Sequence, residues 1–416
     1  MSGYLTGCVR RVSVPGASWT RKATGRVVAR SPHLPLGGPG MSFIFDREPA
    51  YLLLEDGRRF DGVRVGRGEE AVGEVVFNTS MTGYQEILTD PSYTGQIVVM
   101  TVPLVGNYGV NAQDQESPAP RVSGFVVREM ARTPSSWRAS GSLEEYLDRH
   151  GVNALTEVDT RALTRHLRSA GAMRGAIAAA ETPEADLLER IRRHPPMEGL
   201  DLAHEAGLGE TYDVTPSGPE RFQVLAFDFG IKNHSPKLMA ERGCRVTVLP
   251  PDSLTEGVVD DRVDGIFISN GPGDPAAVSG VVEALSEMAR RGIPILGICL
   301  GHQLVARAFG GRTYKLPFGH HGANHPVQNL HRGFVEITSQ NHGFAVEEEE
   351  GAVAGAPELR VTHRNLYDGT VEGLAHSNLP VFAVQYHPEA APGPHDSRYL
   401  FDDFIREMEG VSGNAV

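Results

Sequence analysis

Short apolar runs alternate with segments of helical spacing in the second half of the chain. The runs Val224–Phe227, Val246–Leu249 and Gly265–Ser269 each have the length of a buried strand, and helical patterns follow up to Arg242 and through Arg290. Strands covered by helices on both faces read as continuous apolar runs rather than as alternating ones. This half therefore predicts an α/β fold with a mostly parallel, doubly wound sheet.

The first half of the chain is richer in strands. Tyr51–Leu54 and Val63–Val65 flank Asp56-Gly57, and this arrangement predicts a hairpin. Gln96–Val102 has the composition of a buried strand. We expect a strand-rich α/β domain here.

Two helices are expected among these strands. One follows Ser142, because a serine with Glu145 three residues later has the pattern of a capping box. The other covers Thr160–Arg168 behind Asp159. The chain is then divided into a leader (1–40), an N-terminal domain (45–189), a proline-rich linker (190–221) and a C-terminal domain (222–412).

Cys299 stands where an apolar strand turns into a helix. Ile295, Leu296 and Ile298 precede it, and the apolar positions after it recur with helical spacing. Such an elbow presents a side chain at the carboxyl end of the sheet, and the positive end of the helix favours thiolate over thiol. The alternative is a buried cysteine that packs as a small hydrophobic residue.

A second segment favours the interpretation of Cys299 as a nucleophile over that of a packed hydrophobic residue. The strand Val381–Val384 leads into His387 and Glu389, which are two residues apart and so point the same way along an extended chain. Glu389 could orient the imidazole toward Cys299, as in a cysteine, base and orienter triad. Taken singly, each of the two could equally be a solvated surface residue.

Together these motifs resemble the class I, or triad, glutamine amidotransferases, and among them the small, glutamine-hydrolysing subunit of carbamoyl phosphate synthetase. Four further runs carry the resemblance, which covers about residues 50 to 405: Phe77–Tyr93, Ser269–Pro275, Phe318–Pro326 and Gln340–Phe344. The first of these runs lies outside the shared glutaminase domain and indicates the carbamoyl phosphate branch.

The resemblance implies a set of site residues. Cys299 would attack the carboxamide of L-glutamine, with His387 as the acid and base and Glu389 as its orienter, and the backbone amides of Gly273 and Leu300 would hold the oxyanion. The ends of glutamine would be bound by Ser92, Gly271, Gln303, Asn341, Gly343 and Phe344. Because Ser92 belongs to the first domain, this site would straddle two domains.

The resemblance also implies a partner. Carbamoyl phosphate synthesis needs ATP and bicarbonate, and no nucleotide motif is visible in this chain. The loop with Gly271 and Gly273 lacks the Gly-Lys-Ser/Thr of a phosphate loop. ATP and magnesium are therefore expected on a large synthetase subunit, in a heterodimer or higher heteromer, and no cofactor is expected here. The alternatives are the glutaminase of another synthetase, a free-standing glutamyl hydrolase, and a catalytically silent binding subunit.

His320, His321 and His325 raise the possibility of a zinc site. We disfavour it, because neighbouring histidines in an extended segment point apart and the same run belongs to the family resemblance. We therefore expect no metal.

Composition limits the partners and the cellular compartment that we expect for this protein. The net charge of −13 disfavours a nucleic-acid partner, no run approaches a membrane span, and three cysteines suit a reducing compartment. Of 39 basic residues 4 are lysines, which leaves 35 arginines.

The leader is basic and without acidic residues before Asp46. This pattern indicates either a transit peptide or a gene start placed too early, with Met41 as the favoured start. We expect this leader to be disordered and the protein to be cytoplasmic, or organellar if the leader is a transit peptide.

Overall fold

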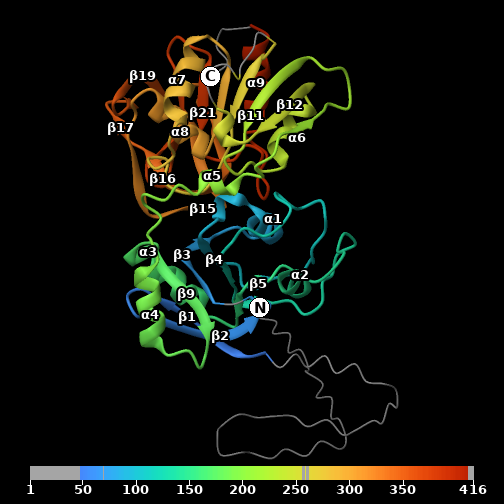
Figure 1. Ribbon diagram of the computed structural model, residues 1–416, viewed down its shortest axis with the longest axis vertical. Coiled ribbons are helices and arrows are strands. Elements are labelled where there is room, and N and C mark those ends of the chain that lie inside the picture. The colour runs from blue at the N-terminus through green and yellow to red at the C-terminus, as the bar shows by residue number, and fades with distance from the viewer. Residues whose placement is uncertain (1–46, 69, 255–257, 259–261, 411–416) are drawn as a thin grey trace, which may run out of the picture. The chain divides into compact units, whose positions relative to one another are not determined.

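Seven strands of the first half close into a barrel. The computed structural model describes residues 47–410 except 69, 255–257 and 259–261, so the predictions for the leader lie outside the described residues. The barrel order is β1-β2-β8-β6-β4-β3-β9, with the strands β1 (Pro49–Leu54), β2 (Arg59–Val65), β3 (Ala71–Asn78), β4 (Gln96–Met100), β6 (Gly124–Val126), β8 (Ala154–Thr156) and β9 (Met173–Ala179) (Figure 1).

The local predictions for this half are confirmed. β1 and β2 pair as an antiparallel hairpin, and β4 covers residues 96–100 of the predicted strand Gln96–Val102. Ser142 and Glu145 form the capping box of α2 (Leu143–Arg149), and the Asp159 side chain caps α3 (Thr160–Ala170). The remaining elements of this half are α1 (Tyr84–Thr89), η1 (Pro91–Tyr93), the short parallel pair β5 (Leu104–Val105) and β7 (Glu129–Met130), and α4 (Glu184–Arg193).

Period-two burial explains the packing of the barrel. Leu52 and Leu54 pack in one apolar cluster with Leu163 and Leu167 of α3, whereas Tyr51 and its neighbour Leu53 pack in a second cluster under α4. Residues i and i+2 of a strand share a face, so β1 is buried on both of its faces.

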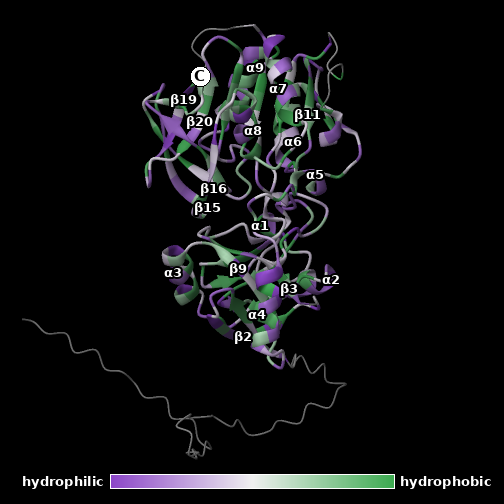
Figure 2. Cartoon of the chain, turned by 60° about the vertical axis from the view of Figure 1, so that its left-hand side comes forward, coloured by the Kyte–Doolittle hydropathy of each residue, from purple (hydrophilic) through white to green (hydrophobic). Residues whose placement is uncertain are grey.

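The second half builds the predicted doubly wound sheet around five parallel strands. Their order is β12-β11-β13-β14-β21, with β11 (Phe222–Phe227), β12 (Cys244–Leu249), β13 (Gly265–Ile268), β14 (Ile295–Ile298) and β21 (Val381–Val384). The helices α7 (Val281–Arg290) and α8 (Leu300–Ala308) cover one face, and α6 (His234–Ala240) and α9 (Tyr399–Met408) cover the other. Figure 2 shows hydrophobic colour along strands such as β11 between these helical layers.

Antiparallel strands extend this sheet beyond the prediction. β21 continues into β20 (Val371–His376), β19 (Ala356–Asn365), β15 (Thr313–Asn329) and the edge strand β16 (Val335–Val346), with the short strands β17 (Glu348–Glu349) and β18 (Ala352–Val353) beside them. At the opposite edge, β10 (Tyr212–Val214) pairs antiparallel with β12. The segment 190–221, expected to be a linker, therefore contains α5 (Ala203–Ala206) and the strand β10 of the sheet. The short helix η2 (Pro251–Ser253) follows β12.

Candidate active site

Cys299 occupies a strained turn between β14 and α8. Its backbone has φ 55° and ψ −103°, a conformation that residues with a side chain rarely adopt. The turn is tight because a Cβ on Gly301 would lie 2.2 Å from the backbone oxygen of Ile268 in the neighbouring strand. The predicted elbow is present, with Cys299 at its strained position.

His387 and Glu389 follow β21, which pairs in parallel with β14, so the two chain segments emerge side by side. The imidazole Nδ1 of His387 lies 2.6 Å from a carboxylate oxygen of Glu389, and the backbone N–H of His387 donates to the Ser339 carbonyl at 2.9 Å. Among the described residues, the buried Nε2 of His387 has no hydrogen-bond partner. The expected contact between residues two apart is thus present, and it leaves the second ring nitrogen for chemistry.

The charges around this pair reinforce each other. Burial lowers the pKa of the His387 imidazole, but the charges of Glu389 and Cys299 outweigh burial and raise the pKa to about 10. Burial raises the pKa of the Glu389 carboxyl, yet His387 and Lys232 together lower it to about 2. At neutral pH the histidine is therefore protonated and the glutamate ionised.

Lys232 and Asp90 complete this network, and sequence reasoning missed both. The fully buried ammonium of Lys232 donates to the Ala391 carbonyl at 2.8 Å and lies 3.4 Å from Glu389 and 3.7 Å from Asp90. Burial lowers the pKa of this ammonium, but the two carboxylates raise it above its usual range. Asp90 precedes η1 in the first half of the chain, so a barrel residue reaches the triad through one buried cation.

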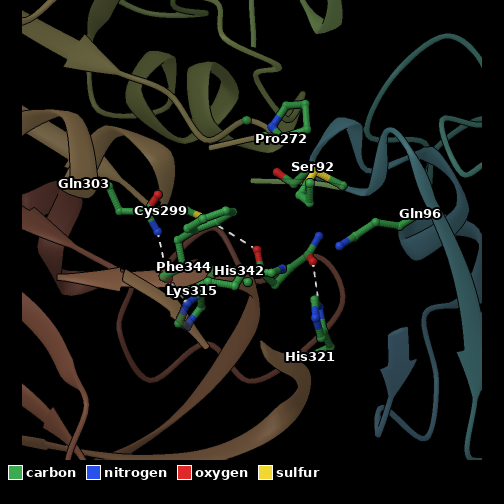
Figure 3. Close-up of a pocket in the computed structure, with 14 residues that line it drawn as sticks. Ser92, Gln96, Pro272, Cys299, Gln303, Lys315, His321, His342 and Phe344 are labelled. Carbon is green, nitrogen blue, oxygen red and sulfur yellow. Dashed lines mark hydrogen bonds between the residues drawn. The ribbon is translucent and has the colours of Figure 1, made fainter. Parts of the chain in front are cut away.

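A pocket opens in front of the Cys299 side chain (Figure 3). The predicted residues that line it come from both halves of the chain: Ser92, Gly271, Gly273, Cys299, Gln303, Asn341, Gly343 and Phe344. Leu300 does not line the pocket. Its backbone N–H is the first of α8, where helical amides lack an acceptor within the helix. His387 and Glu389 also lie outside the lining.

Hydrogen bonds hold the pocket side chains in place. The Gln303 amide donates to the carbonyl of Phe344 at 2.9 Å, and the Ser92 hydroxyl accepts from Asn270 at 3.0 Å. Asn341 donates from its side chain to Asp90 at 3.0 Å, while its backbone carbonyl accepts from the thiol of Cys299 at 3.4 Å. Asp90 of the first half therefore anchors the segment that contacts Cys299.

Several lining residues were not predicted. They are Gln96, Met197, Pro272, Lys315, His321 and His342. The sequence carried two usable signals for them, because Pro272, His321 and His342 lie inside the runs that carry the family resemblance and Lys315 is among only four lysines in the chain.

Two of the three histidines considered for zinc have different hydrogen-bond partners. His320 lies 2.8 Å from Asp368, whereas His321 lies 3.0 Å from the side-chain oxygen of Asn341. The adjacent histidines thus point apart, as the extended segment predicted. A different trio, His320, His342 and Glu372, has potential ligand atoms within 4.8 Å of one another. The absence of a metal site stays a prediction.

Two family models match the two halves of the chain. The family model described as carbamoyl-phosphate synthase small chain, CPSase domain, matches residues 52–177, and that of glutamine amidotransferase class-I matches residues 225–407. No helix of the described ranges is long and apolar enough to cross a membrane.

Curated relatives match nearly the whole chain. Carbamoyl phosphate synthase small chains from Chlorobaculum tepidum and Streptomyces avermitilis are each 52% identical to it, over 364 and 366 residues. Both alignments cover 87% of this chain, with 98% and 96% of the respective relative. The protein from Salmonella typhimurium is 48% identical over 375 residues, covering 86% of this chain and 97% of the relative. The chain therefore belongs to the family of carbamoyl phosphate synthase small chains, glutamine-hydrolysing subunits with a class I glutamine amidotransferase domain.

Proposed function

We propose that this chain hydrolyses L-glutamine through a thioester on Cys299 and delivers the ammonia to a large synthetase subunit. The observation that carries the proposal is the strained Cys299 at the pocket, backed by the buried His387–Glu389 pair. The thiolate attacks the carboxamide carbon of glutamine, and the Gly273 and Leu300 amides stabilise the oxyanion.

His387 moves the proton in both halves of the reaction. As the protonated imidazole it donates to the leaving ammonia, which departs as the glutamyl thioester forms. The neutral imidazole then takes a proton from water, and the resulting hydroxide attacks the thioester to release glutamate and restore the thiolate. Glu389 fixes the ring and stabilises its positive charge. Ammonia in bulk water would be protonated and lose its nucleophilicity, so a sealed route to the partner is expected.

Glutamine selection involves both halves of the chain. Ser92 lies in the pocket beside residues of the sheet, and its backbone N–H is held by the Asp90 carboxylate at 2.9 Å. We assign the amino and carboxylate ends of glutamine to Ser92, Gln303 and Asn341, and to the backbone of Gly271, Gly343 and Phe344.

An exposed apolar row supports a heteromeric assembly with the large subunit. Cross-strand pairing places Pro326 between Ile337 and Leu366 on one face of the sheet, while the alternate residues Glu336 and Asn365 are buried. This inverts the usual pattern, because the charged and amide side chains point inward and the apolar ones outward. Ile337 of this row lies on β16, the strand that also carries Ser339 and the pocket residue Asn341, so an ammonia acceptor docked on the row would sit near the site.

The docking surface is tested by a charge placed in the row. Leu366→Asp should weaken binding of the large subunit, measured by sedimentation or calorimetry. Leu104→Asp, at a site of similar exposure in β5 of the first half, is the matched control. Equal affinities for the two variants would contradict the assignment of this surface.

The decisive experiment for the function is ammonia release from glutamine, measured for the chain alone and with the large subunit. Cys299→Ser should abolish glutamine-dependent carbamoyl phosphate synthesis and spare synthesis from added ammonia. Full glutamine hydrolysis by the chain alone, with a rate that does not change when the large subunit is added, would favour a free-standing glutaminase. No hydrolysis in either condition would favour a silent binding subunit. The cytoplasmic location also stays a proposal, which subcellular fractionation would check.

A further inference from the structure

Lys315 places a positive charge in the glutamine pocket. Its ammonium lies 4.9 Å from the centre of the Phe344 ring, and a Cβ built on Gly343 would be 2.8 Å from its Nζ. Lys315 therefore stands beside the two backbone positions assigned to glutamine binding, in the same lining as Cys299 (Figure 3).

None of the other lining residues adds a charge to the pocket beside that of Lys315. Among the 14 residues that line the pocket there is no carboxylate. Burial lowers the pKa of both His321 and His342, so these imidazoles are neutral at pH 7. Free glutamine carries an α-carboxylate, which needs a cationic or N–H donor in a partly buried site. Lys315 is the one permanent cation of this lining.

Two barrel residues hold the ammonium in position. Glu74 of β3 accepts from the Nζ of Lys315 at 2.8 Å, and its second oxygen accepts from the Gln96 amide at 2.8 Å. Glu74 and Gln96 are paired neighbours in adjacent strands. An ammonium has three N–H donors; one is used by Glu74 and the Phe344 ring attracts the charge, which leaves donor capacity for a substrate carboxylate.

The choice of lysine is itself informative. Arginine supplies 35 of the 39 basic residues of this chain, yet the cation beside the His387–Glu389 pair is the buried Lys232 and the cation of the pocket is the partly exposed Lys315. An ammonium is a compact point charge with freely rotating donors, whereas a guanidinium is a broad planar fork. The narrow space beside Gly343 suits the former.

We propose that Lys315 binds the α-carboxylate of glutamine, with Glu74 and Gln96 as its positioning residues. The inference rests on the proposed hydrolysis of glutamine and adds a specificity element to it. The barrel would then help to select a free amino acid over a derivative whose α-carboxyl is blocked. The competing account is that Lys315 and Glu74 form only a structural ion pair between barrel and sheet. Such a pair would stabilise the protein without binding the substrate.

The test compares two substrates in the complex with the large subunit. Ammonia release is measured from L-glutamine and from L-glutaminamide, in which a neutral amide replaces the α-carboxylate. Lys315→Met should raise the KM for glutamine at least about tenfold, as expected for the loss of a charge-assisted hydrogen bond. It should leave kcat within about twofold, because the carboxylate is bound equally in the ground and transition states. The KM for glutaminamide should be the same in both proteins.

Glu74→Gln separates the two accounts. This variant keeps the ammonium but loosens it, so the rise in KM for glutamine should be smaller than with Lys315→Met. Equal changes for both substrates in both variants, with equal losses of thermal stability, would show a plain ion pair and overturn the proposal. Calorimetric binding of glutamine to Cys299→Ala, with and without Lys315→Met, repeats the comparison without turnover. If the unaltered complex shows no Cys299-dependent hydrolysis while glutamine still binds through Lys315, the proposed function fails and the binding role stands.

Discussion

The buried pair Asp90–Lys232 should couple the barrel to the triad by a measurable free energy. The two charges are 3.7 Å apart, and both side chains are almost completely buried. With an effective dielectric constant of about 20, unit charges at this distance attract by about 4 kcal/mol. Removing one partner leaves the other charge buried and short of a counter-charge, which is the costly way to break such a pair.

A double-mutant cycle measures this coupling. Asp90→Asn, Lys232→Met and the double variant are unfolded in urea at pH 7 and followed by far-ultraviolet circular dichroism. The coupling free energy should be about 2–4 kcal/mol, since part of the attraction is offset by solvation of the freed group. Lys232 keeps Glu389 and the Ala391 carbonyl in the Asp90 variant, so that variant should remain folded.

A shorter but exposed pair provides the control. Arg312 and Glu347 lie 2.8 Å apart, and about half of each side chain is exposed. Water and salt screen such pairs, so the same cycle on Arg312→Met and Glu347→Gln should show little coupling. A coupling for Asp90–Lys232 no larger than that of the control would refute the reasoning, because burial would then add nothing to the interaction.

Three further predictions concern the triad, the elbow and a helix start. Glu389→Gln removes the charge that raises the pKa of His387 to about 10 against burial, so the alkaline limb of kcat/KM for glutamine should move to lower pH; an unchanged limb would contradict the assignment. Gly301→Ala places a Cβ 2.2 Å from the Ile268 carbonyl oxygen and should cost about 1–3 kcal/mol in urea unfolding. Ser142→Ala removes the capping box of α2 and should cost about 1 kcal/mol by the same measurement, and no loss would show that the box is not stabilising.

Local patterns carried most of what could be predicted from the sequence. The elbow at Cys299 and the histidine–glutamate contact depend on spacings of a few residues, which the backbone geometry of strand and helix determines. The capping box at Ser142 is likewise a contact over three residues. These features follow from short stretches of chain, so one sequence suffices to expect them.

Longer-range features escaped the same reasoning. β15 is a single strand of 17 residues that contains three histidines and two prolines, so it shows no clear two-residue alternation. The barrel closes by pairing β1 with β9, more than 100 residues apart, and no local pattern records that contact. Prolines at 195 and 196 suggested a linker, yet Tyr212–Val214 pairs with a strand whose own position depends on the rest of the sheet.

The barrel touches the reacting groups along two separate routes that start from one carboxylate. One oxygen of Asp90 holds Asn341, whose carbonyl contacts the Cys299 thiol. The same oxygen lies within 3.7 Å of Lys232, whose ammonium reaches the triad carboxylate. A glutaminase sheet without its barrel would leave Lys232 with one counter-charge instead of two, and Asn341 without its anchor. The first half of the chain therefore supports the proposed site, and residues 222–410 alone should bind and hydrolyse glutamine poorly even if they fold.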